Sequence, residues 1–218
     1  MNKGKDIKIT PEPLKMMVTV NNVTLKVESN YFFISRRDRC TEFLKIDDPK
    51  EADILEFLLN LHFVLEIGIN TFFRYYYKLF SNYDFFKDGN EIDKVGFYDK
   101  VTIFLNENSF TLETGENLNT SRQRVNEIIG LIKNFNNVRN MIVHGHSVNE
   151  ISYGEEKTQS SLKSKLNKDY CIKQIESFKK IILNINYFID RLDTKVRRDT
   201  IEMFQKNYLD LNFLDIKK

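Results

Sequence analysis

The sequence feature that most constrains the fold is the long stretch Glu51 to Phe80, which contains no proline and only one glycine, Gly68. Pro49 stands just before it, where the fixed φ angle of proline suits the first turn of a helix. A stretch of this length that is apolar almost all round predicts one long helix. Charged residues such as Glu66 and Arg74 interrupt it, so we do not expect it to cross a membrane.

Two further segments carry apolar residues at helical spacing. Thr120 followed by Gln123 fits a capping box, and the helix that it opens should end near Gly145. Its apolar positions are Val125, Ile128, Ile129, Ile132, Phe135, Val138 and Ile142. Asn167 or Asp169 can cap the next helix, whose apolar positions are Ile172, Ile175, Phe178, Ile182, Ile185, Ile189 and Leu192. Three long helices with apolar faces predict an all-α, antiparallel helical bundle.

The shorter elements give weaker patterns. Residues 18–34 alternate apolar and polar residues around Asn21-Asn22, which predicts a small β-hairpin. Residues 97–105 fit a short helix slightly better than a strand, residues 200–208 suggest a last helix, and residues 146–166 show no period and predict a loop. We therefore expect an N-terminal extension with a β-hairpin over residues 1–46 and a helical domain over residues 47–218.

Composition limits where the chain works and what it binds. Cys40 and Cys171 are the only cysteines, and they lie far apart, which favours free thiols in a reducing compartment. The first ten residues lack the apolar core of a signal peptide, so we expect a cytoplasmic protein. Lys plus Arg (33) nearly balances Asp plus Glu (31), so any contact with nucleic acid must come from a local site.

The segment that contains Arg139, Asn140 and His144 places a permanent cation, an amide and an imidazole within two helical turns. Asn140 and His144 are four residues apart and share a helix face, and the long side chain of Arg139 can reach the same place. Such groups suit phosphodiester chemistry without a metal, because histidine can give or take a proton near neutral pH and arginine holds phosphate oxygens. RNA supplies the nucleophile, its 2′-OH. Cleavage then needs a base that takes the 2′-OH proton and an acid that protonates the leaving 5′-oxygen. A two-fold dimer would bring two such sets together.

The helix that ends in Arg-Asn, three residues and His-Gly resembles the signature of the HEPN superfamily, an arginine followed after four to six residues by a histidine. The resemblance covers residues 50–210 and excludes the hairpin. It implies a HEPN-like bundle and a cofactor-free, metal-independent endoribonuclease that acts as a homodimer on RNA, with Arg139 and His144 catalytic and Asn140 supporting. Members of the family occur in toxin–antitoxin and phage-defence systems, which implies an antitoxin protein as a further partner. Some members are non-catalytic dimers that bind RNA, nucleotide or protein.

Other interpretations of this segment remain open. His146 also lies within the family's spacing from Arg139 and could replace or assist His144, although the Gly145 that follows His144 favours His144. A histidine near a helix C-terminus is also favoured by the helix dipole alone, and an arginine there can simply be solvated. A His-Gly-His metal site lacks a third ligand, so we expect no metal.

Two other groups of residues could support the site. Glu66 and Asn70 follow His62 at four-residue intervals on the long apolar helix, which indicates either a cleft lining that meets Arg139 or a thin exposed edge. The basic residues near the last helix could hold RNA phosphates, although such runs are usually solvated. They are Lys195, Arg197 and Arg198. The aromatic residues from Phe72 to Phe80 are expected in the core rather than against RNA bases.

Overall fold

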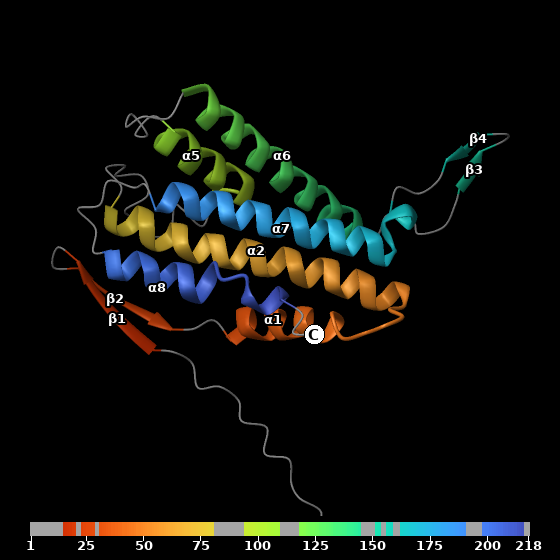
Figure 1. Cartoon of the computed structure of the whole chain (residues 1–218), viewed down its shortest axis with the longest axis horizontal. Helices are drawn as coiled ribbons and strands as arrows, with labels where there is room; N and C mark the ends of the chain where they lie inside the picture. The colour runs from red at the N-terminus through yellow and green to blue at the C-terminus, as the bar shows by residue number, and fades with distance from the viewer. Residues whose placement is uncertain are drawn as a thin grey trace, which may run out of the picture.

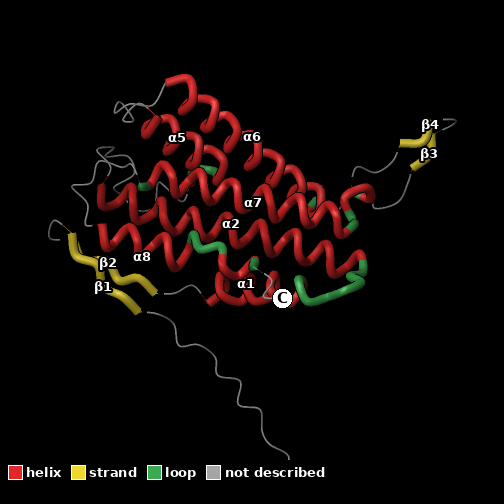
Figure 2. The backbone as a smooth tube through the Cα atoms, in the orientation of Figure 1, coloured by secondary structure: helices red, strands yellow, loops and turns green. Residues whose placement is uncertain are grey.

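The structure is a computed structural model that describes residues 15–20, 23–28, 31–80, 94–109, 118–144, 151–153, 156–158, 162–190 and 198–215. In chain order its elements are β1 (Lys15–Val20), β2 (Val23–Glu28), α1 (Tyr31–Phe43), α2 (Glu51–Phe80), α5 (Phe97–Ser109), α6 (Leu118–Val143), β3 (Ile151–Tyr153), β4 (Glu156–Thr158), the 3-10 helix η1 (Lys163–Lys165), α7 (Lys168–Ile189), α8 (Arg198–Tyr208) and the 3-10 helix η2 (Asn212–Leu214). These residues are mostly helical (Figure 2), which confirms the prediction of a mainly helical chain.

Helix α2 lies at the centre of the molecule and packs against α1, α5, α6, α7 and α8. The three long helices lie side by side, with α2 and α7 running in one direction and α6 in the opposite one (Figure 1). Every fourth side chain of α2 is almost fully buried, because this spacing repeats nearly once per helical turn. These residues are Phe57, Leu61, Leu65, Ile69 and Phe73.

Aromatic rings join α2 to α5. Phe73 and Phe104 have ring centroids 4.8 Å apart, and Phe72 meets Phe104 edge to face at 6.0 Å. Phe72 and Phe73 are buried as expected of core residues, while the side chains of residues 74–80 lie outside the described part. Segment 97–105 falls within α5, as its spacing predicted.

The close approach of α8 to α2 depends on a glycine. A Cβ atom at Gly68 would lie 2.6 Å from the backbone oxygen of Tyr208, which is shorter than any normal contact. Only glycine therefore lets the end of α8 reach the backbone of α2. Gly130 on α6, in contrast, has no atom within 4 Å of such a Cβ.

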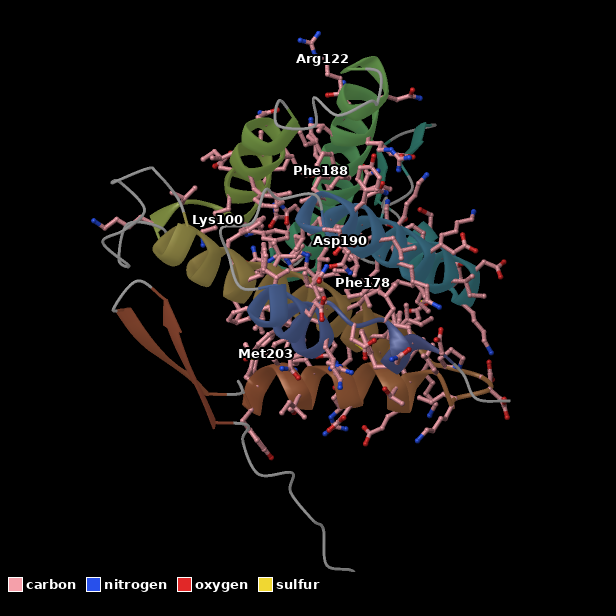
Figure 3. The ribbon with its side chains drawn as sticks, turned by 60° about the vertical axis from the view of Figure 1, so that its left-hand side comes forward. Lys100, Arg122, Phe178, Phe188, Asp190 and Met203 are labelled. Carbon is pink, nitrogen blue, oxygen red and sulfur yellow. The ribbon has the colours of Figure 1, made fainter. Side chains whose placement is uncertain are left out.

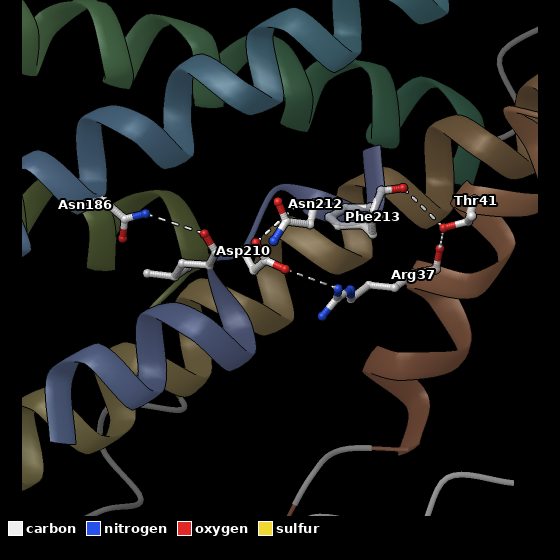
Figure 4. A network of polar contacts seen from close by, with 7 residues as sticks. Arg37, Thr41, Asn186, Asp210, Asn212 and Phe213 are labelled. Carbon is white, nitrogen blue, oxygen red and sulfur yellow. Dashed lines mark hydrogen bonds and ion pairs between the residues drawn. The ribbon is translucent and has the colours of Figure 1, made fainter. Parts of the chain in front are cut away.

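The C-terminal segment ties α1 to the rest of the molecule (Figure 4). Thr41 Oγ1 donates a hydrogen bond to the backbone oxygen of Phe213 at 3.2 Å, and Arg37 forms an ion pair with Asp210 at 3.7 Å. The guanidinium of Arg37 also lies 4.9 Å from the ring centroid of Phe213. Helix α1 is therefore held from two sides, by α2 and by the chain that follows α8.

The structure differs from the expectations at the N-terminus and between α6 and α7. Residues 31–34, expected in the second strand of the hairpin, form the first turn of α1, and the described second strand ends at Glu28. Within residues 146–166, expected to be a loop, the short strands β3 and β4 pair antiparallel and η1 follows. The turn residues Asn21 and Asn22 lie outside the described part, between β1 and β2, which pair antiparallel.

The predicted caps of α6 and α7 can be compared with the observed helix ends. Asn167 caps α7 as predicted, because its side chain accepts a hydrogen bond from the backbone nitrogen of Tyr170 at 2.8 Å. Helix α6 begins at Leu118, two residues before the expected cap at Thr120. It ends at Val143, close to the expected end near Gly145.

Candidate functional site

The candidate site lies at the C-terminal end of α6. Phe135 and Val138 are buried against the core, and this anchoring leaves the next positions at the edge of the helix. Arg139 is half-buried, whereas Asn140 and His144 are exposed. The backbone nitrogen of His144 donates to the backbone oxygen of Asn140 at 2.9 Å, so the helical path continues to His144. The imidazole therefore stands one turn beyond the amide and is open to solvent.

The guanidinium of Arg139 is directed toward Asn140. Its Nη1 donates a hydrogen bond to Asn140 Oδ1 at 3.0 Å. Its Nε is buried and has no hydrogen-bond partner among the described residues. The structure thus brings Arg139 and Asn140 into direct contact, and it places His144 on the same helix end without a described side-chain bond between His144 and Arg139.

The polar residues of α2 form a second part of the site. His62 is only 2% exposed, and its Nε2 lies 3.2 Å from Glu66 Oε2. The hydrogen bond from His62 lowers the pKa of the Glu66 carboxyl, and the charges of His62, Arg139 and Lys100 lower it further, against the burial that raises it. No hydrogen bond or ion pair joins the described side chains of Glu66 and Arg139, so their expected meeting across the helices stays a prediction.

Lys100 on α5 is a member of this site that the sequence did not reveal. The residue, which Figure 3 labels, is 5% exposed. Its Nζ donates a hydrogen bond to Asn70 Oδ1 at 3.1 Å. One signal could have found it: Lys100 comes three residues after Phe97 and four before Phe104, so it falls on the apolar face of α5. We call His62, Glu66, Asn70, Lys100 and Arg139 the inter-helix polar cluster.

The remaining predicted residues cannot be added to this site. His146, Lys195 and Arg197 lie outside the described residues. Arg198 is the first residue of α8, but its side chain is not described. The candidate residues that the structure describes therefore come from α2, α5 and α6.

Cys40 and Cys171 are free and buried, and burial raises the pKa of each thiol to about 12. Among the described residues, no group of three or more His, Cys, Asp and Glu side chains could hold a metal ion. Within the same ranges, no helix combines the length and apolar character that a membrane crossing requires.

Comparisons of the chain with protein families, with curated proteins and with solved structures found no match.

Proposed function

We propose that this chain is a metal-independent endoribonuclease that cuts single-stranded RNA, with Arg139, His144 and Asn140 at its active site. The observation that carries the proposal is the exposed end of α6, where the Arg139 guanidinium is bonded to Asn140 and His144 stands one turn further on. A guanidinium and an imidazole at one solvent-exposed place suit a phosphodiester that binds from outside. The HEPN-like bundle with an accessory N-terminal hairpin belongs to the same proposal.

The reaction needs groups that these side chains supply. A histidine takes the proton from the 2′-OH, whose oxygen then attacks the neighbouring phosphorus. The bond from phosphorus to the 5′-oxygen breaks, and a second histidine gives a proton to that leaving oxygen. The products are a 2′,3′-cyclic phosphate and a 5′-hydroxyl. Arg139 stabilises the charge that develops on the phosphate oxygens, because its planar guanidinium can hold two of these oxygens at once.

One chain supplies one His144, whereas the reaction uses a base and an acid. A homodimer that places two copies of the α6 end at one groove supplies both, with two Arg139 side chains around the phosphate. This arrangement predicts that activity per chain falls on dilution below the concentration at which the dimer dissociates. Sedimentation of the protein over the same concentrations measures that dissociation.

The direct test is cleavage of labelled single-stranded RNA in EDTA by the wild type, Arg139→Ala and His144→Ala. Each substitution should lower the rate by about 100-fold or more, because each removes a group used in the transition state. Arg122→Ala is the matched control, since Arg122 is an exposed arginine on the same helix. A 2′-deoxy substitution at the cut position should abolish cutting.

Three results would contradict parts of this proposal. Loss of cutting in EDTA would exclude the metal-independent reaction. Equal RNA retention by the wild type and His144→Ala, without cleavage, would favour a non-catalytic dimer that binds RNA, nucleotide or protein. Full loss in His146→Ala, with activity kept in His144→Ala, would move the catalytic role to His146.

A further inference from the structure

A pocket lies between α1 and the first half of α2, which run beside each other (Figure 1). Its volume is about 130 Å³, and it is partly open to solvent. A protein cavity of about 150 Å³ accommodates benzene, so this pocket has room for about six non-hydrogen atoms of a small organic molecule. None of the residues that line it belongs to the candidate site at the end of α6.

The inner part of the pocket offers a hydrogen-bond donor. Asn60 lines the pocket and is only 1% exposed. Arg36 Nη1 donates to Asn60 Oδ1 at 2.9 Å, which fixes the orientation of the amide. Asn60 Nδ2 is buried and has no hydrogen-bond partner among the described residues. A buried donor without an acceptor is costly, so a bound molecule that presents a carbonyl oxygen to Nδ2 would remove this cost.

One wall of the pocket is apolar. The rings of Phe43 and Phe57 stack with their centroids 4.2 Å apart, and both residues line the pocket. Ile46, which also lines it, is 37% exposed. A small aliphatic group that packs against this wall would remove apolar surface from water.

The outer part of the pocket is negatively charged. Among the described residues that line it, Glu42, Asp53 and Glu56 carry carboxylates, whereas Arg39 carries a positive charge. Arg39 Nη1 lies 3.2 Å from Glu42 Oε2, and its Nε lies 4.0 Å from Glu56 Oε1. One guanidinium cannot neutralise three carboxylates. The surplus negative charge therefore favours a cation in the pocket and disfavours an anion.

We infer that the pocket between α1 and α2 binds a small organic cation in which an ammonium group stands next to an amide carbonyl. The ammonium group lies beside Glu42 and Glu56, the carbonyl oxygen accepts from Asn60 Nδ2, and a small aliphatic group packs against the phenylalanine rings. An amino-acid amide and the first residue of a peptide both carry these groups. The inference goes beyond the proposed ribonuclease function and does not depend on it.

The first experiment varies the ligand. The full chain, labelled with 15N, is titrated with valinamide and followed by NMR, and a dissociation constant of about 1 mM is expected for a ligand of this size. Isobutylamine lacks the carboxamide and 3-methylbutanamide lacks the ammonium group, so each should bind at least about fivefold more weakly. Free valine should also bind more weakly, because its carboxylate meets the negative charge of the pocket.

Two results of this titration would overturn the inference. One is the absence of any shift at about 10 mM valinamide, which is ten times the expected dissociation constant. The other is equal binding of isobutylamine and valinamide, because the carbonyl would then contribute nothing. Valyl-alaninamide distinguishes the two sources of the ligand: tighter binding than valinamide indicates the start of a peptide, and weaker binding indicates a free small molecule. Both outcomes support the inference.

The second experiment varies the protein, and two exposed residues should act in opposite directions. Glu56→Gln removes an attractive charge and should weaken valinamide binding about threefold, whereas Arg39→Gln removes a competing cation and should strengthen it about twofold. Glu176→Gln is the control, because Glu176 is an exposed residue of α7 that does not line the pocket. Equal weakening by Glu56→Gln and Arg39→Gln would overturn the inference.

Asn60→Asp tests the inner donor. The substitution keeps the shape of the side chain and replaces Nδ2 by an oxygen, so valinamide binding should fall at least about tenfold. Unchanged binding would overturn the role of Asn60. If this variant does not fold, the comparison of valinamide with isobutylamine in the wild type decides the same point.

Discussion

Helix α2 carries two ionic groups that differ in their surroundings. Near its start, Glu56 faces Arg39 of α1, which also pairs with Glu42, and all three side chains are more than half exposed. In its middle, Glu66 belongs to the inter-helix polar cluster, beside the nearly inaccessible His62 and one turn before Asn70, which accepts from the buried Lys100. The same kinds of charge thus occur both at the surface and where three helices meet.

The difference in burial decides how strongly the charges within each group interact. Water and salt screen the surface group, so its ion pairs stabilise the fold little and leave the side chains free to move. The inter-helix polar cluster is screened less, and removing one member takes an interaction from its neighbours.

The largest expected effect comes from Lys100→Ala, which removes a buried cation and the apolar stem that carries it. Asn70 loses its donor and Glu66 loses a nearby positive charge, so the free energy of unfolding should fall by about 3 kcal/mol. Lys179→Ala is the control: it breaks an ion pair with Asp215 at 2.8 Å at the surface and should cost less than about 1 kcal/mol. Urea unfolding measures both free energies of unfolding. Equal losses would mean that the buried Lys100 stabilises the fold no more than the surface residue Lys179.

Two glycines extend the same contrast to the backbone. Gly68→Ala places a Cβ 2.6 Å from the backbone oxygen of Tyr208, and since neither helix can yield easily, it should destabilise the protein by about 2 kcal/mol. Gly130→Ala meets no atom within 4 Å and should stabilise it by about 0.5–1 kcal/mol, because alanine favours the helix. Thermal unfolding compares them, and a stable Gly68→Ala protein would show that α8 is not seated on α2.

Acid titration should give a smaller effect with a definite sign. The pKa of Glu66 is lowered from 4.5 by the hydrogen bond from His62 and by the charges of His62, Arg139 and Lys100. The ionised carboxylate therefore stabilises the fold fully above this ordinary value, and the contribution is lost as the pH falls through the lowered pKa. Unfolding between pH 6 and 3 should show Glu66→Gln losing less stability than the wild type. The stability of Glu56→Gln should fall with pH as that of the wild type does. A Glu66→Gln stability curve that runs parallel to the wild-type curve would contradict a lowered pKa of Glu66.

How much of the fold the sequence predicts depends on how regular each segment is. The helices α2, α6 and α7 were predicted because their apolar residues recur over many turns. Helix α1 was missed because its buried residues, Phe33, Cys40 and Phe43, are few and widely spaced among charged ones. The strands β3 and β4 have three residues each, which is too short to show a period.

The site shows a similar limit. The four-residue spacing of His62 and Glu66 on an apolar helix predicted a polar edge, because that spacing alone puts two side chains in contact. The burial of Lys100 could not be predicted in the same way. A lysine on an apolar face usually extends its ammonium into water, and only the packing of α5 against α2 and α6 keeps this one inside.

The smallest expected effect is the coupling between Arg39 and Glu56, whose Nε and Oε1 atoms lie 4.0 Å apart with both side chains more than half exposed. A double-mutant cycle with Arg39→Ala and Glu56→Ala should give about 0.3 kcal/mol, because water screens the pair and ordering two long side chains offsets the attraction. Raising the salt concentration should remove even this. The equivalent cycle between Glu66→Gln and Lys100→Met should give a larger coupling that salt changes little, since these charges are less accessible to ions. Equal couplings for the two pairs would mean that burial does not distinguish them.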